Sequence, residues 1–118
     1  LPTMEISEAV NALSALAHET RLRVFRLLVE AGEEGLPSTE IARELDVSKS
    51  LMSTHLNVLT RSGLAGSVRV GRQIIYRIDL EATRSLLSYL VENCCHGRAD
   101  QCASLLDEIL PVYGCTPH

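Results

Sequence analysis

The chain is poor in aromatic residues, with no tryptophan, one phenylalanine and three tyrosines among its 118 residues. Leucine, valine and isoleucine must therefore supply most of its hydrophobic core. No apolar run is long enough to cross a membrane, and the N-terminus lacks the basic region and apolar stretch of a signal peptide. The length allows one compact domain, and we expect a cytoplasmic protein, in which thiols stay reduced.

The sequence also lacks the residue arrangements on which enzymes depend. It shows no pair of catalytic acids, no glycine-rich phosphate loop and no nucleophile placed with a base. An enzyme would need a pocket of which the sequence gives no sign. We therefore expect a binding protein that is not an enzyme.

Acidic residues are missing from one long segment of an otherwise acidic chain. No Asp or Glu occurs between Ser48 and Ile78, although the whole chain has fifteen. This segment carries five basic residues: Lys49, Arg61, Arg69, Arg72 and Arg77. The rest of the chain holds six basic and fifteen acidic residues, so the net charge of −4 hides a strongly basic stretch. Basic charge collected on one segment indicates a site for a polyanion.

The first third of the chain has the apolar periodicity of two helices. Ser7 is a candidate cap for the first helix. Its apolar positions are Ile6, Val10, Leu13 and Leu16. The second helix is expected after His18, and glycine ends it at Gly32. Its apolar side consists of Leu22, Phe25, Leu28 and Val29.

Two further helices are expected on either side of a tight turn at Asp46–Val47. Ser38 is the predicted cap of a short third helix. The buried side of that helix consists of Ile41, Ala42 and Leu45. Ser48 is the predicted cap of a fourth helix, which runs to Arg61 and stops at Gly63.

The fourth helix has two contrasting sides. Met52, Leu56 and Leu59 form an apolar stripe that should pack on the preceding helices. The other side is polar at every helical position: Ser50, Ser53, Thr54, Asn57 and Arg61. Short hydrogen-bonding side chains followed by an arginine suit the major groove of DNA. An ordinary surface helix would more often carry pairs of Glu and Lys there.

A β-hairpin with a basic tip is expected next. Ser67–Val70 alternates in polarity, Gly71-Arg72 fits a two-residue type II′ turn, and Gln73–Ile78 is the return strand. Together with the preceding helices, this hairpin predicts a mainly α winged helix-turn-helix fold with a small β-hairpin. The residues expected to contact DNA are Lys49, Ser50, Ser53, Thr54, Asn57, Arg61, Arg69 and Arg72.

The last predicted helix runs from about Asp79 to Asn93. Its apolar residues are Leu80, Leu86, Leu87, Leu90 and Val91. They offer more apolar surface than one side of a small domain needs, which favours pairing with a second subunit. We therefore expect a DNA-binding and dimerisation domain over residues 4–93, and a cysteine-containing, inducer-binding tail over residues 94–118.

Three of the four cysteines fall within nine residues, at Cys94, Cys95 and Cys102. Clustered thiolates are soft ligands, and three sulfurs complete the coordination of trivalent arsenic or antimony. Zinc needs four ligands. Possible fourth donors are His96, Asp100 and Cys115. We expect an arsenical site; zinc, cadmium or a similar ion is the second alternative, a thiol redox switch the third, and small buried apolar cysteines the fourth.

Two stretches of the sequence resemble the ArsR/SmtB family of metal-sensing repressors. One is Leu16–Leu28, and the other is Val47–Leu59, whose pattern Ser-x-His-Leu-x-x-Leu-x-x-x-Gly-Leu continues to Leu64. The resemblance covers roughly Ile6 to Val91. It implies a homodimer formed largely by the first and last helices, which binds operator DNA and releases it when an inducer binds. The interface residues that it implies are Val10, Leu13, Leu86, Leu87 and Leu90.

One part of the family pattern is absent. Many members have a Glu-Leu-Cys-Val-Cys-type pair of cysteines where this chain has Glu44-Leu-Asp-Val-Ser48. The family's zinc site across the dimer is not expected either, because no histidine follows Asp79 before His96. The clustered cysteines are similar to a relocated site of some arsenic-responsive members. The sequence thus predicts a DNA-binding repressor released by trivalent arsenic; a zinc or cadmium sensor and a metal-sequestering protein are the alternatives.

Overall fold

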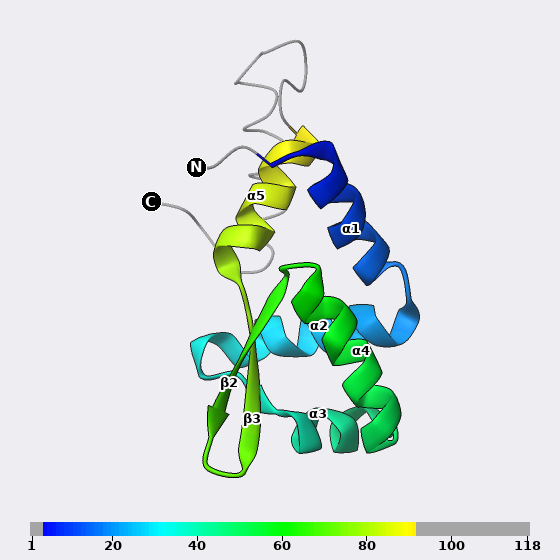
Figure 1. Cartoon of the computed structure of the whole chain (residues 1–118), viewed down its shortest axis with the longest axis vertical. Helices are drawn as coiled ribbons and strands as arrows, with labels where there is room; N and C mark the ends of the chain where they lie inside the picture. The colour runs from blue at the N-terminus through cyan, green and yellow to red at the C-terminus, as the bar shows by residue number, and fades with distance from the viewer. Residues whose placement is uncertain (1–3, 92–118) are drawn as a thin grey trace. The chain divides into compact units, whose positions relative to one another are not determined.

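Residues 4–91 are the part of the chain that the computed structural model describes, and they form helices around a small sheet (Figure 1). In chain order the elements are α1 (Ile6–Leu16), α2 (Glu19–Ala31), a 3₁₀ turn (Gly32–Glu34), β1 (Leu36–Pro37), α3 (Ser38–Leu45), α4 (Lys49–Arg61), β2 (Ala65–Val70), β3 (Gln73–Ile78) and α5 (Leu80–Val91). This order confirms the mainly helical winged helix-turn-helix fold. The predicted cysteine cluster and the predicted domain end at residue 93 lie outside the described residues. None of the helices in residues 4–91 has the length and hydrophobicity needed to cross a membrane.

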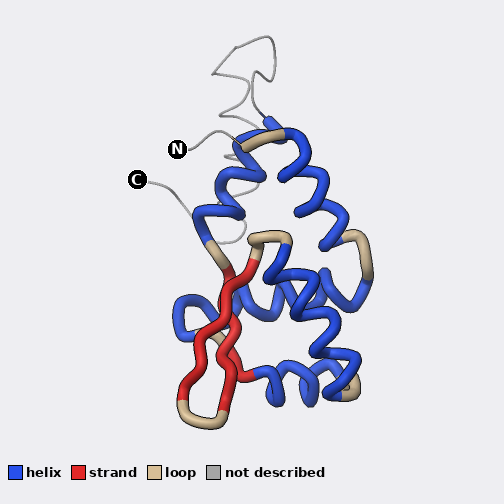
Figure 2. The backbone as a smooth tube through the Cα atoms, in the orientation of Figure 1, coloured by secondary structure: helices blue, strands red, loops and turns tan. Residues whose placement is uncertain are grey.

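The hairpin of β2 and β3 has the predicted turn, and a third strand joins it. The strands pair antiparallel with Val70 opposite Gln73, and Gly71 in the turn has a φ of 63°. β1 lies on the other side of β3, with Leu36 opposite Tyr76 (Figure 2). The sequence does not predict β1, because two residues that include a proline are too short a run to indicate a strand.

The core is aliphatic, as the scarcity of aromatic residues predicts. Its completely buried side chains come from α2, α3, α4 and the loop before β2: Val24, Leu28, Ile41, Met52, Leu56, Leu59 and Leu64. Tyr76 and Ile78 of β3 close the core from the side of the sheet. The apolar stripe predicted for α4 therefore packs inward.

The buried side of α1 differs from the one predicted from its larger apolar residues. Ile6, Val10 and Leu13 are 67%, 55% and 42% exposed. The buried side of the helix consists of three alanines: Ala9, Ala12 and Ala15. Small side chains allow helices to approach each other closely, which leaves the longer aliphatic side chains of α1 outside.

Two other predicted faces are corrected by the structure. On α2, Val24 and Leu28 are buried. Leu22 and Val29, which the sequence places on the buried side, are exposed because the helix is rotated slightly from the predicted orientation. On α5, Leu86 is only 4% exposed. It packs inside its own chain, so it does not offer the exposed surface that the predicted dimer interface needs.

The starts of α1 and α4 differ in how well they follow the predicted caps. Ser48 Oγ accepts the Leu51 N–H at 3.2 Å, which confirms Ser48 as the cap of α4. α1 instead begins after Glu5, whose backbone N–H donates to the Glu8 carboxylate at 2.9 Å. Ser7 therefore lies inside the first turn, and its prediction as a cap is wrong because the Glu8 carboxylate of the same turn reaches back to the helix start.

α3 begins one residue before its predicted start, whereas α5 begins one residue after it. Pro37 has the extended conformation that precedes a helix, with φ −66° and ψ 147°, so Ser38 is the first helical residue of α3 and not its cap. Asp79 precedes α5, and its Oδ1 accepts the Ala82 N–H at 3.0 Å. The sequence predicts Asp79 as the first residue of this helix, whereas in the structure Asp79 is its cap.

Candidate nucleic-acid interface

The turn between α3 and α4 fixes the direction in which α4 leaves. Asp46 takes the left-handed conformation, with φ 53°, and its N–H donates to the Arg43 carbonyl at 3.3 Å. The Val47 N–H donates to the Ala42 carbonyl at 3.0 Å. Ser48 then caps α4. These contacts end one helix and start the next within three residues, which is the geometry of a helix-turn-helix.

The outer side of α4 is polar and largely unengaged. Its exposed polar residues are Ser50, Ser53, Thr54, Asn57 and Arg61. Lys49 and Leu51 of the first turn are also exposed, Leu51 by 51%. The Thr54 hydroxyl donates to the Ser50 carbonyl one turn earlier, at 3.3 Å. Within residues 4–91, the side chains of Ser50, Ser53 and Asn57 make no hydrogen bond. These three short side chains are therefore available to the edges of bases.

The hairpin of β2 and β3, which is the wing of the fold, carries basic residues near α4. Arg69 pairs with Ile74, and paired residues of antiparallel strands lie on the same face. Because side chains alternate along a strand, Tyr76 also lies on this face. Ile74 and Tyr76 line a cavity together with side chains of α4, so Arg69 is on the side of the hairpin toward α4. Arg72 lies in the turn at the tip.

The basic residues of this region have no ion-pair partner in the part of the chain that the structure describes. The ion pairs found there join neighbours one turn apart on α2, α3 and α5: Arg23–Glu19, Arg43–Glu40 and Arg84–Glu81. The predicted polyanion segment therefore keeps its positive charge uncompensated. Such a surface attracts the phosphate backbone of DNA.

Arg61 follows Asn57 by one turn but lies at the opposite end of α4 from Lys49. It is the last residue of α4, roughly 18 Å along the helix axis from Lys49. It lines a pocket with Asn11 and Ser14 of α1 and with Arg21 of α2. The structure thus does not bring Arg61 together with the wing tip, and its contact with DNA stays a prediction.

Known proteins share the sequence that builds this interface. A family model described as a helix-turn-helix domain matches residues 16–66. The uncharacterized HTH-type transcriptional regulator YbzH of Bacillus subtilis (strain 168) is 30% identical over 95 residues, which cover 70% of this chain and 95% of that protein. The putative arsenical resistance operon repressor ArsR of Halobacterium salinarum is 39% identical over 79 residues, which cover 67% of this chain and 60% of that protein.

Solved structures share the fold. The ArsR-like transcriptional regulator from Rhodococcus sp. RHA1 matches with a TM-score of 0.66 at 27% identity, over 88% of this chain and 94% of that chain. The chain belongs to the ArsR family of winged helix-turn-helix transcriptional regulators. A homodimeric winged helix-turn-helix DNA-binding domain from Mycobacterium bovis, a possible ArsR-family regulator, matches with a TM-score of 0.62 at 25% identity, over 73% of this chain and 78% of that chain. These relatives bear the names of transcriptional regulators.

A buried histidine supports α4 of this ArsR-family regulator from inside. Arg21 Nη1 lies 3.4 Å from His55 Nδ1, so Nδ1 is the acceptor and the ring proton is on Nε2. The His18 ring lies 4.6 Å from the His55 ring, and His18 caps α2 by accepting the Thr20 N–H. Arg21 Nε also donates to the Ala15 carbonyl at 2.6 Å. The sequence gives no signal for this network, because its members come from three helices and from positions far apart in the chain.

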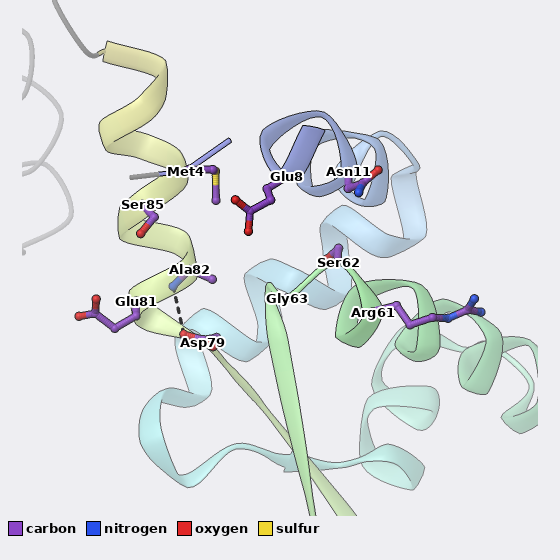
Figure 3. Close-up of a pocket in the computed structure, with 10 residues that line it drawn as sticks. All are labelled: Met4, Glu8, Asn11, Arg61, Ser62, Gly63, Asp79, Glu81, Ala82 and Ser85. Atoms are coloured by element: carbon purple, nitrogen blue, oxygen red, sulfur yellow. Dashed lines mark hydrogen bonds between the residues drawn. The ribbon is translucent and has the colours of Figure 1, made fainter. Parts of the chain in front are cut away.

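A cleft of about 410 Å³ opens between α1, the turn after α4 and the start of α5 (Figure 3). Glu8, Asp79 and Glu81 contribute carboxylates to its lining. Asp79 is engaged as the cap of α5. Nowhere in residues 4–91 do three or more His, Cys, Asp or Glu side chains gather as a metal site would require. The predicted metal ligands lie outside the described residues: Cys94, Cys95 and Cys102.

Burial lowers the pKa of His55 below its ordinary value of 6.5, and the neighbouring His18 and Arg21 lower this pKa further. The unfolded chain binds a proton at this histidine near pH 6.5, whereas the folded protein binds it only at lower pH. Between these two pH values the unfolded state holds more protons. The contribution of His55 to the free energy of unfolding is therefore complete above about pH 6.5 and is lost as the pH falls through the folded-state pKa.

We expect urea unfolding at a fixed protein concentration to show decreasing stability as the pH is lowered from about 7 to about 5. His55→Gln keeps a hydrogen-bond acceptor but does not titrate, so its stability should depend less on pH over this interval. His18→Asn keeps a capping acceptor and removes the neighbouring imidazole, so the pH dependence should weaken without disappearing. An unchanged pH dependence in His55→Gln would contradict the assignment.

Proposed function

We propose that this ArsR-family regulator is a homodimeric repressor that binds operator DNA and releases it when trivalent arsenic binds the clustered cysteines of residues 94–102. The observation that supports DNA binding most directly is the polar outer side of α4 beside a wing whose basic residues have no acidic partner in the described chain. A protein that only sequesters a metal needs no such surface.

In the proposed complex, α4 enters the major groove. Ser53 and Asn57 meet the edges of bases, since both side chains are short, exposed and able to donate and accept hydrogen bonds. Arg69 and Arg72 of the wing contact the adjacent backbone, where contacts add affinity without reading sequence. Lys49, at the first turn of α4, precedes both sets of contacts in chain order.

Asn57→Ala should weaken binding to the operator by about 1–3 kcal/mol and change binding to a scrambled duplex much less, because it removes a contact to a base edge. Arg72→Ala should weaken binding to both duplexes and lower the slope of log affinity against log salt by about one unit, because it removes a phosphate contact. Fluorescence anisotropy at several salt concentrations measures both effects.

Arg26→Ala is the matched control for the wing variant, because Arg26 is an exposed arginine of α2 outside the proposed interface. It should bind both duplexes as the parent does. Parent-like operator binding by both Asn57→Ala and Arg72→Ala would exclude the proposed placement of α4 and the wing.

The exposed aliphatic side chains of α1 and α5 support the homodimer. Ile6, Val10 and Leu13 follow one side of α1, and Leu87 and Leu90 of α5 are 57% and 52% exposed. Moving such side chains out of water stabilises an interface by about 25 cal/mol per Å². The homodimeric state of the Mycobacterium bovis domain adds support. A symmetric dimer presents two copies of α4 to half-sites about one DNA turn apart, roughly 34 Å.

Leu87→Asp should leave monomers or insoluble protein, because it would bury a carboxylate in the proposed interface. Leu22→Asp is the matched control, since Leu22 is 45% exposed on α2 and lies outside the predicted interface. Sedimentation velocity should show a dimer for the parent and for Leu22→Asp. A Leu87→Asp protein that stays dimeric would rule out this role for α5.

The proposed inducer follows from the chemistry of the cysteines. Three thiolates complete the ligand set of trivalent arsenic or antimony and leave no position for water, whereas zinc or cadmium would take a fourth donor. The Halobacterium relative bears the name of an arsenical resistance operon repressor, which favours arsenic over the other ions. Such a ligand lowers DNA affinity only as far as it binds the DNA-free state more tightly than the bound state.

Cys95→Ser should fold, dimerise and bind operator DNA as the parent does, but arsenite should no longer release the DNA, because one of three sulfurs is lost. Cys102→Ser should keep a response to methylarsenite, which needs two sulfurs. Cys115→Ser is the control and should respond as the parent does. Titration of the protein–operator complex with arsenite, methylarsenite and zinc separates these outcomes. Full arsenite release from Cys95→Ser excludes the site, and a need for Cys115 with zinc favours four-coordinate metal sensing.

A further inference from the structure

A cavity of about 110 Å³ lies where α3, α4 and the wing meet. Its lining includes Ser38, Thr39, Lys49, Ser53, Ile74 and Tyr76. Every polar side chain in this lining can donate a hydrogen bond, and no carboxylate lines the cavity. A space lined by donors from three different elements suits an anion.

The start of α3 adds a backbone donor to this cavity, which Thr39 lines. The Thr39 N–H precedes the first intrahelical hydrogen bond, and Pro37 provides no capping side chain. A helix N-terminus also carries partial positive charge. Glu40, the acidic residue of this turn, lies 3.9 Å from Arg43 and does not line the cavity. The Glu40 carboxylate, which is the negative charge closest in sequence to Ser38 and Thr39, is therefore paired with Arg43.

Tyr76 gives a second observation, independent of the helix start, that points to a ligand in this cavity. Its side chain is only 8% exposed, yet its hydroxyl makes no hydrogen bond within residues 4–91. Every fully buried polar side-chain atom of the described residues has a partner, so this hydroxyl must keep an opening to solvent. Tyr76 also lines the cavity. A hydroxyl that has no protein partner and keeps an opening to solvent can donate its hydrogen bond to an acceptor that enters there.

Lys49 places a full positive charge at the same cavity. It is the single lysine of the chain, it is exposed on the first turn of α4, and no carboxylate of the described residues pairs with it. An ammonium group beside hydroxyl and backbone donors favours an oxyanion over a neutral ligand.

We propose that this cavity holds one phosphate of the DNA backbone, bound by the Tyr76 hydroxyl, the Lys49 ammonium and the N-terminus of α3. The inference rests on the proposed DNA-binding function and assigns one phosphate contact within it. Because wing, α3 and α4 hold the same phosphate, this contact sets the depth and register of α4 in the groove. Tyr76 is then a DNA-contacting residue, although it also belongs to the core cluster.

The test uses the full-length protein and a duplex that the wild-type protein selects from a random-sequence library. Tyr76→Phe removes one oxygen and keeps the buried ring. It should bind both the selected duplex and a scrambled duplex about tenfold more weakly, with unchanged thermal unfolding. Tyr89→Phe is the matched control, because Tyr89 does not line the cavity, and it should bind as the parent does.

Neutral methylphosphonates, placed one at a time along the selected duplex, locate the phosphate. The parent should lose about tenfold affinity at one position in each half-site. That loss should shrink to about twofold or less in Tyr76→Phe, because the two changes remove the same hydrogen bond. Lys49→Gln should reduce the loss at the same position and lower the salt slope by about one unit.

Tyr76→Phe that binds as tightly as the parent, or that keeps the parent's methylphosphonate profile, overturns the phosphate assignment and leaves DNA binding standing. If Tyr76→Phe unfolds at a lower temperature, Ser38→Ala and Lys49→Gln decide the assignment at the same position. If the wild-type protein selects no duplex, the proposed DNA-binding function fails, and this inference fails with it.

Discussion

The buried side of α4 is the feature on which the other parts of this structure depend. Met52, Leu56 and Leu59 are almost inaccessible to solvent and pack in one cluster with side chains of α2, α3 and β3. Full burial of each such side chain stabilises the fold by roughly 1.5–3 kcal/mol. Because an α-helix has 3.6 residues per turn, three inward side chains also fix which residues point outward. Hydrophobic packing therefore places Ser53 and Asn57 on the exposed side of α4, although their side chains make no hydrogen bond within residues 4–91.

β1 ties the wing to the helix-turn-helix in the same indirect way. Gly35 has a φ of 69°, and a Cβ at this position would collide with the Tyr76 carbonyl. The glycine thus allows a close approach of the two backbones, after which Leu36 pairs with Tyr76 and Pro37 leads into α3. Two residues of strand set the wing against the first turn of α3, and the donor-lined cavity lies at this junction.

Local chemistry explains which parts of the fold the sequence could predict. The cap at Ser48, the stop at Gly63 and the turn at Gly71 follow from residue types that have one dominant conformational use, so α4 and the hairpin were predicted close to their observed ends. Periodicity identified α1 as a helix with an apolar row. It does not tell which partner the row meets, and in this chain alanines pack inward while Val10 stays exposed.

The parts of the site that the sequence could not predict are contacts between distant residues. Arg21 and His55 are 34 positions apart and meet only because α1, α2 and α4 pack together. Tyr76 looks like any core tyrosine in the sequence, since only the packed structure shows a nearly buried side chain whose hydroxyl has no hydrogen-bond partner within residues 4–91. No spacing rule connects it with Lys49 or Ser38, which belong to other elements.

The turn before α4 also bears on where an inducer site can lie. Where many family members have paired cysteines, this chain has Asp46 in a left-handed conformation and Ser48 capping α4. Both residues shape the turn that directs α4, and aspartate tolerates the left-handed conformation better than most residues. The proposed inducer site accordingly draws on cysteines beyond Val91. Residues 16–66 carry the match to the helix-turn-helix family, so selectivity for an inducer can change in the tail while the hydrophobic packing that places the recognition side of α4 is kept.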